Sequence, residues 1–322
     1  MKLCVLENLY HGKTWDETLS IISSLGVHYV EVGAGGYPGK EHCDPEVLLA
    51  DPARYEEFCA TLRKYDMHVS ALAAHGNPLH PDKAIAAQFD KDFRNAVLLA
   101  EKLGVDTVVT FSGCPGDSEN SLYPNWVTCP WPNDFLTILK WQWEEKVIPY
   151  WRETAAFAKA HGVCRIAFEM HPGFCVYNPE TLLRLREAVG DVIGANLDPS
   201  HLIWQGIDPV AAVRALHGAI YHVHAKDTRI DTYNTAVNGV LDTKKYSDEA
   251  HRSWIFRSVG YGHGESYWRD FISALNLFGY DRAISIEHED GLMSVDEGLA
   301  KAVAVLKNVI IESPKPGKIG WI

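Results

Sequence analysis

Four short segments in the second half of the chain combine carboxylates and imidazoles, the side chains that bind divalent cations and move protons. Each segment follows directly on a run of apolar or β-branched residues. The four segments are Glu169-Met170-His171, Asp198-Pro199-Ser200-His201, His222-Val223-His224-Ala225-Lys226 and Glu287-His288-Glu289. If those runs are adjacent strands of a parallel barrel, their carboxyl ends share one mouth, and we expect the four segments to meet there.

One residue of each segment offers a metal ligand, and these residues are Glu169, Asp198, His224 and Glu287. Three carboxylates and one imidazole suit Mn²⁺, which we expect, or Mg²⁺, with Co²⁺ and Zn²⁺ as alternatives. For any one of them, a helix cap or a salt bridge to a nearby Lys or Arg is the simpler explanation of a charged strand end. Four in register favour a metal, because three crowded carboxylates without a cation would repel one another and take up protons.

A cation held between two glutamates suits the removal of a proton beside a carbonyl. The cation stabilises the enediolate that forms. Carboxylates on either side then take a proton from one face and return one to the other, which epimerises the carbon. Return of the proton to the neighbouring carbon gives isomerisation, and loss of a β substituent gives elimination. The cluster of ligands is compatible with all three reactions.

Three further polar residues are candidates for contact with a substrate. His171 is our candidate for an additional general base, although a structural role beside a helix cap explains it equally well. His75 ends the third expected strand and could contact substrate. Lys226 could hold a hydroxyl or an oxyanion, and pairing with Glu289 or Asp290 is the equally supported alternative.

Tryptophans supply flat apolar faces that stack on sugar rings, although most tryptophans in proteins are packing residues. The candidates are Trp126, Trp131, Trp141, Trp143 and Trp204. We expect one or two of them in the pocket, Trp143 among them.

Glycines divide the chain into repeated helix and strand units. Six of them end a helical run shortly before a strand, where a left-handed residue is needed: Gly26, Gly104, Gly162, Gly190, Gly218 and Gly279. The expected strands are 2–6, 28–32, 69–73, 107–111, 165–168, 192–196, 220–223 and 283–286. Eight strands alternating with helices predict one (β/α)₈ TIM barrel, with residues 1–322 as a single domain. An open doubly wound sheet is the alternative, but no GxGxxG follows the first strand.

Two segments are longer than a barrel needs. They are 113–135 after the fourth strand and 228–267 after the seventh, and both are rich in polar and aromatic residues. Long loops without structure of their own are usually functional or disordered. We expect a lid, a pocket wall or a subunit contact.

Composition restricts the partners. The 322 residues carry a net charge of −12, which repels nucleic acid and anionic lipid. The chain contains neither a secretory signal nor an apolar run of ~18 residues that could span a membrane. We therefore expect a cytoplasmic protein that acts on a small molecule. The seven cysteines are scattered without a CxxC spacing, so we expect reduced thiols and no thiolate zinc site.

The segments FEMHPG, NLDPSHL, HVHAKD and SIEHED resemble those of the xylose-isomerase-like TIM-barrel superfamily of sugar phosphate isomerases and epimerases. That superfamily includes ketose 3-epimerases and inosose dehydratase. The resemblance implies that Glu169, Asp198, His224 and Glu287 are metal ligands and that His201 faces the substrate. It also implies that Glu169 and Glu287 carry the proton on opposite faces of the sugar, in a homo-oligomer.

Three functions fit these observations. The first is a metal-dependent sugar epimerase or isomerase. The second is a lyase like the large subunit of C-glycoside deglycosidases in this superfamily, which cleaves a 3-keto-glycoside alongside a small β subunit. The long aromatic and polar segments favour a bulkier substrate of that kind. The third is a sugar-binding protein with a vestigial site, against which the intact ligand set argues.

Overall fold

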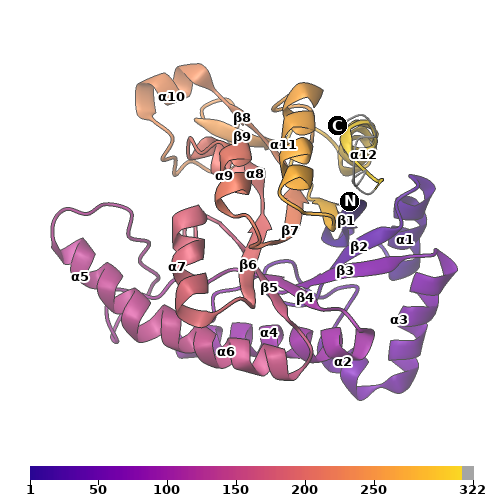
Figure 1. Ribbon diagram of the computed structural model, residues 1–322, viewed down its shortest axis with the longest axis horizontal. Coiled ribbons are helices and arrows are strands. Elements are labelled where there is room, and N and C mark those ends of the chain that lie inside the picture. Colours follow the sequence, from indigo (N-terminus) through magenta and orange to yellow (C-terminus); the bar gives the residue numbers. More distant parts are fainter. Residues whose placement is uncertain (314–322) are drawn as a thin grey trace, which may run out of the picture.

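The computed structural model describes residues 1–313, in which eight parallel strands close into a barrel (Figure 1). The order around the barrel is β1-β10-β7-β6-β5-β4-β3-β2. The strands are β1 (Lys2–Leu6), β2 (Tyr29–Gly33), β3 (His68–Ala73), β4 (Thr107–Thr110), β5 (Arg165–Glu169), β6 (Ile193–Leu197), β7 (Ile220–Ala225) and β10 (Ala283–Ile286). The (β/α)₈ barrel is therefore confirmed. That residues 1–322 form one domain stays a prediction, and its last nine residues lie outside those described.

The helices pack around the barrel (Figure 1). They are α1 (Trp15–Ser24), α2 (Pro45–Ala50), α3 (Pro52–Lys64), α4 (Lys83–Leu103), α5 (Asp134–Trp141), α6 (Ile148–Ala160), α7 (Pro179–Val189), α8 (Pro199–Trp204), α9 (Pro209–Ala215), α10 (Thr232–Asn238), α11 (Glu265–Leu277) and α12 (Val295–Val309). A 3₁₀ helix (Glu7–Tyr10) and a π-helical turn (Gln142–Val147) complete the set. Within residues 1–313 no helix combines the length and apolarity needed to cross a bilayer.

Local sequence explains where these elements begin and end. Thr14 and Glu17 form a capping box at the start of α1, in which each side chain satisfies a free backbone N–H. Asp208 caps α9 ahead of its first-turn proline. At the other end of a helix, Gly104 closes α4 with a φ of 71°, a conformation that costs other residues free energy.

The main apolar core lies between the barrel and its helices. A second, small apolar cluster of Ala71, Val109 and Ala167 comes from β3, β4 and β5, and their strand neighbours belong to the main core. Side chains alternate along a strand, so this second cluster faces the barrel interior. Polar residues, including Glu31, Asn196 and His222, are also buried on barrel strands. This barrel therefore has polar groups at the depth where apolar layers are usual.

The segment after β7 is more ordered than the expected long loop. β8 (Asp227–Ile230) and β9 (Trp254–Arg257) pair antiparallel, with α10 between them. Trp204 of α8 stacks on Trp254 with ring centroids 4.6 Å apart, which fixes this hairpin to the barrel. Figure 1 shows α10 at the periphery, beyond β8 and β9. The expectation of a loop over 228–267 thus missed two strands and a helix.

The segment after β4 is a true extended loop. Within 113–135 it forms neither helix nor strand until α5 begins at Asp134. Its Trp131 is 75% exposed. Gln142 Nε2 stabilises the loop by donating to the carbonyl oxygens of Pro115, Gly116 and Asn125.

Candidate metal centre

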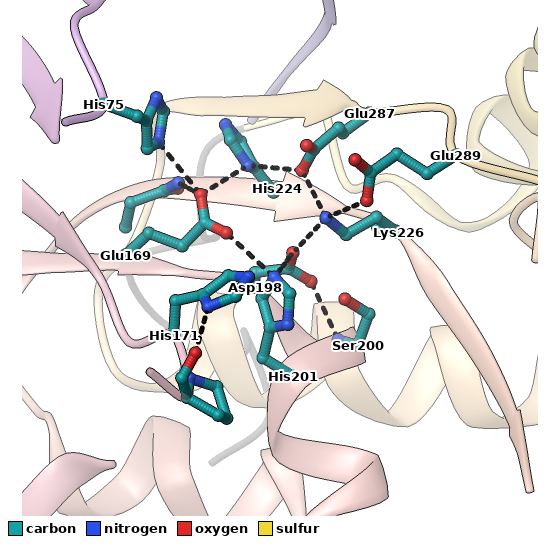
Figure 2. Close-up of polar contacts among 12 residues, drawn as sticks. His75, Glu169, His171, Asp198, Ser200, His201, His224, Lys226, Glu287 and Glu289 are labelled. Atoms are coloured by element: carbon teal, nitrogen blue, oxygen red, sulfur yellow. Dashed lines mark hydrogen bonds and ion pairs between the residues drawn. The ribbon is translucent and has the colours of Figure 1, made fainter. Parts of the chain in front are cut away.

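Four adjacent barrel strands bring the four expected ligands together. Glu169 is the last residue of β5, Asp198 follows β6 and caps α8, His224 lies in β7, and Glu287 follows β10. Each residue offers a ligand atom, and the four atoms lie within 4.8 Å of one another. Figure 2 shows the four side chains converging from different strands. Residues up to 118 positions apart in the sequence therefore form one cluster.

Three of the ligand atoms are buried without an aligned hydrogen bond in the described part of the chain: Asp198 Oδ2, His224 Nδ1 and Glu287 Oε2. His224 Nδ1 lies 2.9 Å from Glu287 Oε2 and 3.3 Å from Glu169 Oε2. Metal–ligand bonds of about 2.1 Å place neighbouring ligand atoms roughly 3 Å apart. Ligand atoms with this spacing and no aligned hydrogen bond fit a divalent cation.

The three carboxylates of the cluster differ in pKa. Burial raises the pKa of Asp198 to about 7, and the neighbouring Glu169 and Glu287 oppose its ionisation further. Burial also opposes the ionisation of Glu287, but Lys226 and His224 hold the pKa of that carboxyl well below 4.5. Without a further cation, the site therefore disfavours the charge on one of its three carboxylates.

Lys226 is the permanent cation beside this cluster. Its Nζ lies 2.9 Å from Glu287 Oε2, 3.2 Å from Asp198 Oδ2 and 3.0 Å from Glu289 Oε2. Burial lowers the pKa of Lys226, but these carboxylates raise it well above 10.5. The salt bridge to Glu289 is thus present, and the ammonium also borders the pocket.

Glu31 of β2 accepts a hydrogen bond from His224 on the side away from the cluster. The sequence analysis did not identify this residue. Both carboxylate oxygens lie 3.0–3.1 Å from His224 Nε2. Burial would raise the pKa of Glu31, but His224 and His222 lower it to about 2. A carboxylate that accepts the Nε2 proton directs the Nδ1 lone pair of His224 toward the cluster. The only signal in the sequence was a glutamate inside the apolar run Tyr29–Gly33.

His222 lies deeper in the barrel than His224. Its Nδ1 is 3.2 Å from Asn196 Oδ1, and Asn196 Nδ2 donates to Glu169 Oε2 over 3.3 Å. Glu31, His222 and His224 are close enough for a cation of their own. His224 Nε2 carries a proton whenever Nδ1 is a ligand. This lower group therefore orients the cluster above it.

A cavity of about 140 Å³ opens onto the cluster. Four of the residues expected to contact substrate line it: His75, His171, His201 and Lys226. Tyr37 and Phe111 form an aromatic wall that the sequence reading did not identify. A larger cavity of about 540 Å³ lies over α1, α2 and α3 and includes none of these residues.

Histidines surround Glu169 in this cavity. His75 Nε2 lies 3.0 Å from Glu169 Oε2, and His201 Nε2 lies 2.9 Å from Glu169 Oε1. The His171 and His201 rings are 4.0 Å apart. Burial lowers the pKa of His201 to about 3 and lowers that of His171 as well. Both imidazoles are therefore neutral at pH 7.

Trp143 does not reach the cavity, so its expected contact with substrate is wrong. It lies in the π-helical turn Gln142–Val147, is 1% exposed and packs in the main core. The Arg184 guanidinium lies 4.1 Å from the centre of its ring. Composition and spacing did not indicate that Trp143 belongs to the core.

Comparisons with known proteins agree on the fold. A model of the family described as "Xylose isomerase-like TIM barrel" matches residues 19–309. The uncharacterized protein YfiH of Bacillus subtilis strain 168 is 40% identical over 313 residues, 96% of this chain and 99% of YfiH. The crystal structure of the IolI protein with a bound zinc atom has a TM-score of 0.65 at 19% identity, over 96% and 98% of the two chains. A D-tagatose 3-epimerase-like protein has a TM-score of 0.64 at 19% identity, with the same coverage.

Proposed function

This chain belongs to the xylose isomerase-like TIM barrel family, and we propose that it is a divalent-metal-dependent isomerase or epimerase of a small sugar. One observation carries the proposal. Buried ligand atoms of Asp198, His224 and Glu287, none of them in an aligned hydrogen bond among the described residues, converge beside Glu169 at the floor of a cavity. The oxygen-rich ligand set favours Mn²⁺, with Mg²⁺ or Co²⁺ as substitutes. The bound zinc of the structurally similar IolI protein supports a cation in this fold.

The protein groups divide the proton transfer between them. A divalent cation bound to the four ligands would polarise the substrate carbonyl and stabilise the negative charge that develops beside it. Glu169 and Glu287 both line the cavity, and each has two carboxylate oxygens. One glutamate removes the proton from the carbon beside the carbonyl, and the other returns a proton. A return to the opposite face gives the epimer, and a return to the neighbouring carbon gives the isomer.

The neighbouring side chains orient the substrate. His75, His201 and Lys226 border the cavity and can bond to hydroxyl oxygens. His171 Nδ1 faces the carbonyl of Pro172 at 2.5 Å, so Nδ1 carries the proton and Nε2 is free to accept one. His171 is therefore the additional base in this proposal.

The direct test is exchange of a substrate proton with solvent. The protein is stripped with a chelator, reloaded with Mn²⁺ and incubated with a panel of ketoses and aldoses in D₂O. We expect deuterium beside the carbonyl, together with a new epimer or isomer, by NMR. The stripped protein should be inactive, and Glu287→Gln should lose 10²–10⁴-fold in turnover.

The matched control is Glu265→Gln, which removes a half-exposed carboxylate at the start of α11, paired with Arg269. This control should keep wild-type turnover. Exchange that survives both chelation and Glu287→Gln would contradict the proposal.

A lyase that cleaves a 3-keto-glycoside is the second candidate, and one observation favours it. An apolar cavity of about 250 Å³, lined by Tyr246, Phe256 and Leu292, shares Glu289 with the metal pocket. An aromatic aglycone would fit there, and Lys226 Nζ is placed to donate a proton to the departing group. Release of the aglycone from a 3-keto-glycoside would identify this reaction. Copurification of a small all-β subunit would support it further.

A further inference from the structure

A second set of ligand atoms lies beside the first. Glu169, His171 and His201 each offer one atom, and these three atoms lie within 4.8 Å of one another. Two imidazoles and one carboxylate form a set typical of zinc sites that keep an open position. We propose that these residues bind a second divalent cation of the zinc type, next to the first site and sharing Glu169 with it.

Glu169 has one oxygen available to each site. Its Oε2 accepts from His75 and Asn196 and lies 3.3 Å from His224 Nδ1. Its Oε1 points to the other side, where His201 Nε2 lies 2.9 Å away (Figure 2). Carboxylates that contact two cations in this way hold them about 3.5–4 Å apart. Glu169 is therefore placed to bridge two cations.

His201 is a buried imidazole whose ring nitrogens make no aligned hydrogen bond in the described chain, and its side chain is 2% exposed. Its Nε2 lies 2.9 Å from Glu169 Oε1 and 3.3 Å from Asp198 Oδ2. Ligands of one cation lie roughly 3 Å from each other. A cation between these atoms would satisfy an imidazole that is otherwise costly to bury.

His171 offers the second nitrogen. The carbonyl of Pro172 can only accept, so the 2.5 Å contact from His171 Nδ1 leaves Nε2 with its lone pair. The His171 ring packs 4.0 Å from the His201 ring. Both rings line the cavity, so a cation can enter from solvent.

Occupation of this second site would have a consequence for the proposed reaction. The Nε2 lone pair of His171 that would accept a proton is the one that would bind zinc. Zinc in the second site therefore removes the additional base. This consequence rests on the proposed function, whereas the site itself does not.

The test counts zinc and needs no substrate, so its outcome is independent of the proposed reaction. Metal-free protein is equilibrated with excess Zn²⁺, separated from free metal by gel filtration and analysed by plasma mass spectrometry. We expect two zinc ions per wild-type chain and one per chain of His171→Ala or His201→Ala. His11→Ala, which removes an exposed histidine paired with Glu41, is the matched control and should keep two.

One zinc ion per wild-type chain would overturn the proposal, as would two in both pocket variants. His201→Gln, closer in size to the native residue, replaces His201→Ala if the latter does not fold. Titration of metal-free wild type with Co²⁺ is a check that needs no variant. Its visible absorption should rise until two equivalents are bound, and saturation at one would contradict a second site.

Discussion

Two buried aspartates at the mouth of the barrel have opposite surroundings. Asp227, directly after Lys226, accepts six hydrogen bonds from five residues: Thr228 N, Gly260 N, Gly262 N, His263 N and Nδ1, and Trp268 Nε1. Asp198 accepts one aligned bond, from Ser200 N to Oδ1, and its Oδ2 has none among the described residues. Both carboxylates are almost completely buried.

The difference separates a structural carboxylate from one that is arranged for a ligand. The donors around Asp227 come from the hairpin, from the loop that follows it and from Trp268 of α11, so this aspartate fastens an extra segment to the barrel. Asp198 instead lies beside other carboxylates. The Lys226 ammonium 3.2 Å away offsets only part of the cost of burying its charge. His263 belongs to this anchor, because its Nδ1 lies 2.8 Å from Asp227 Oδ1.

The largest stability effect should come from Asp227→Asn. The amide turns one acceptor oxygen into a donor that faces other donors, and the negative charge that attracts them is lost. We expect a loss of about 3–5 kcal/mol in the free energy of unfolding. Urea denaturation of the metal-free protein measures it. A loss below 1 kcal/mol would mean that Asp227 is not the anchor of this segment.

Glu31→Gln should weaken the metal site without removing a ligand. The amide keeps the size of the side chain but accepts the His224 proton less strongly, so the orientation and basicity of His224 suffer. We expect Mn²⁺ affinity to fall about 10–100-fold. Calorimetric titration of the metal-free variant checks this, with Glu265→Gln as a control of unchanged affinity.

Asp198→Asn should have the opposite effect on stability to Asp227→Asn. Burial raises the pKa of Asp198 to about 7, so the charged form is disfavoured, and asparagine keeps the cap on α8. In metal-free protein at pH 8 we expect about 1–2 kcal/mol of added stability. Mn²⁺ should raise the melting temperature of wild type but not of this variant. Destabilisation of the metal-free variant would refute the contrast between the two aspartates.

The smallest effect should come from His263→Ala. This change removes one of the six donors to Asp227, namely Nδ1 at 2.8 Å, and leaves the backbone donors in place. We expect a loss of about 1 kcal/mol. Thermal unfolding would show it as a shift of a few degrees, with metal affinity unchanged.

Local patterns predicted the barrel, and they predicted which residues cluster at its mouth, because they depend on neighbours in the sequence. Gly104 ends α4 and Thr14 caps α1 as their residue types require. Glu169 and Glu287 follow apolar runs, and the carboxyl ends of parallel strands meet. The hairpin of β8 and β9 was missed, since its pairing joins residues across a helix and a long turn.

The sequence by itself therefore determined the eight strands, the helix ends and the side chains carried at the barrel mouth. Only the tertiary structure decided which of those side chains have hydrogen-bond partners. Glu31 and His224 are 193 residues apart and meet because barrel closure places β2 and β7 around one interior. The same closure gives Asp227 six hydrogen bonds and Asp198 one, because hydrogen bonding depends on distances and angles that no local pattern encodes.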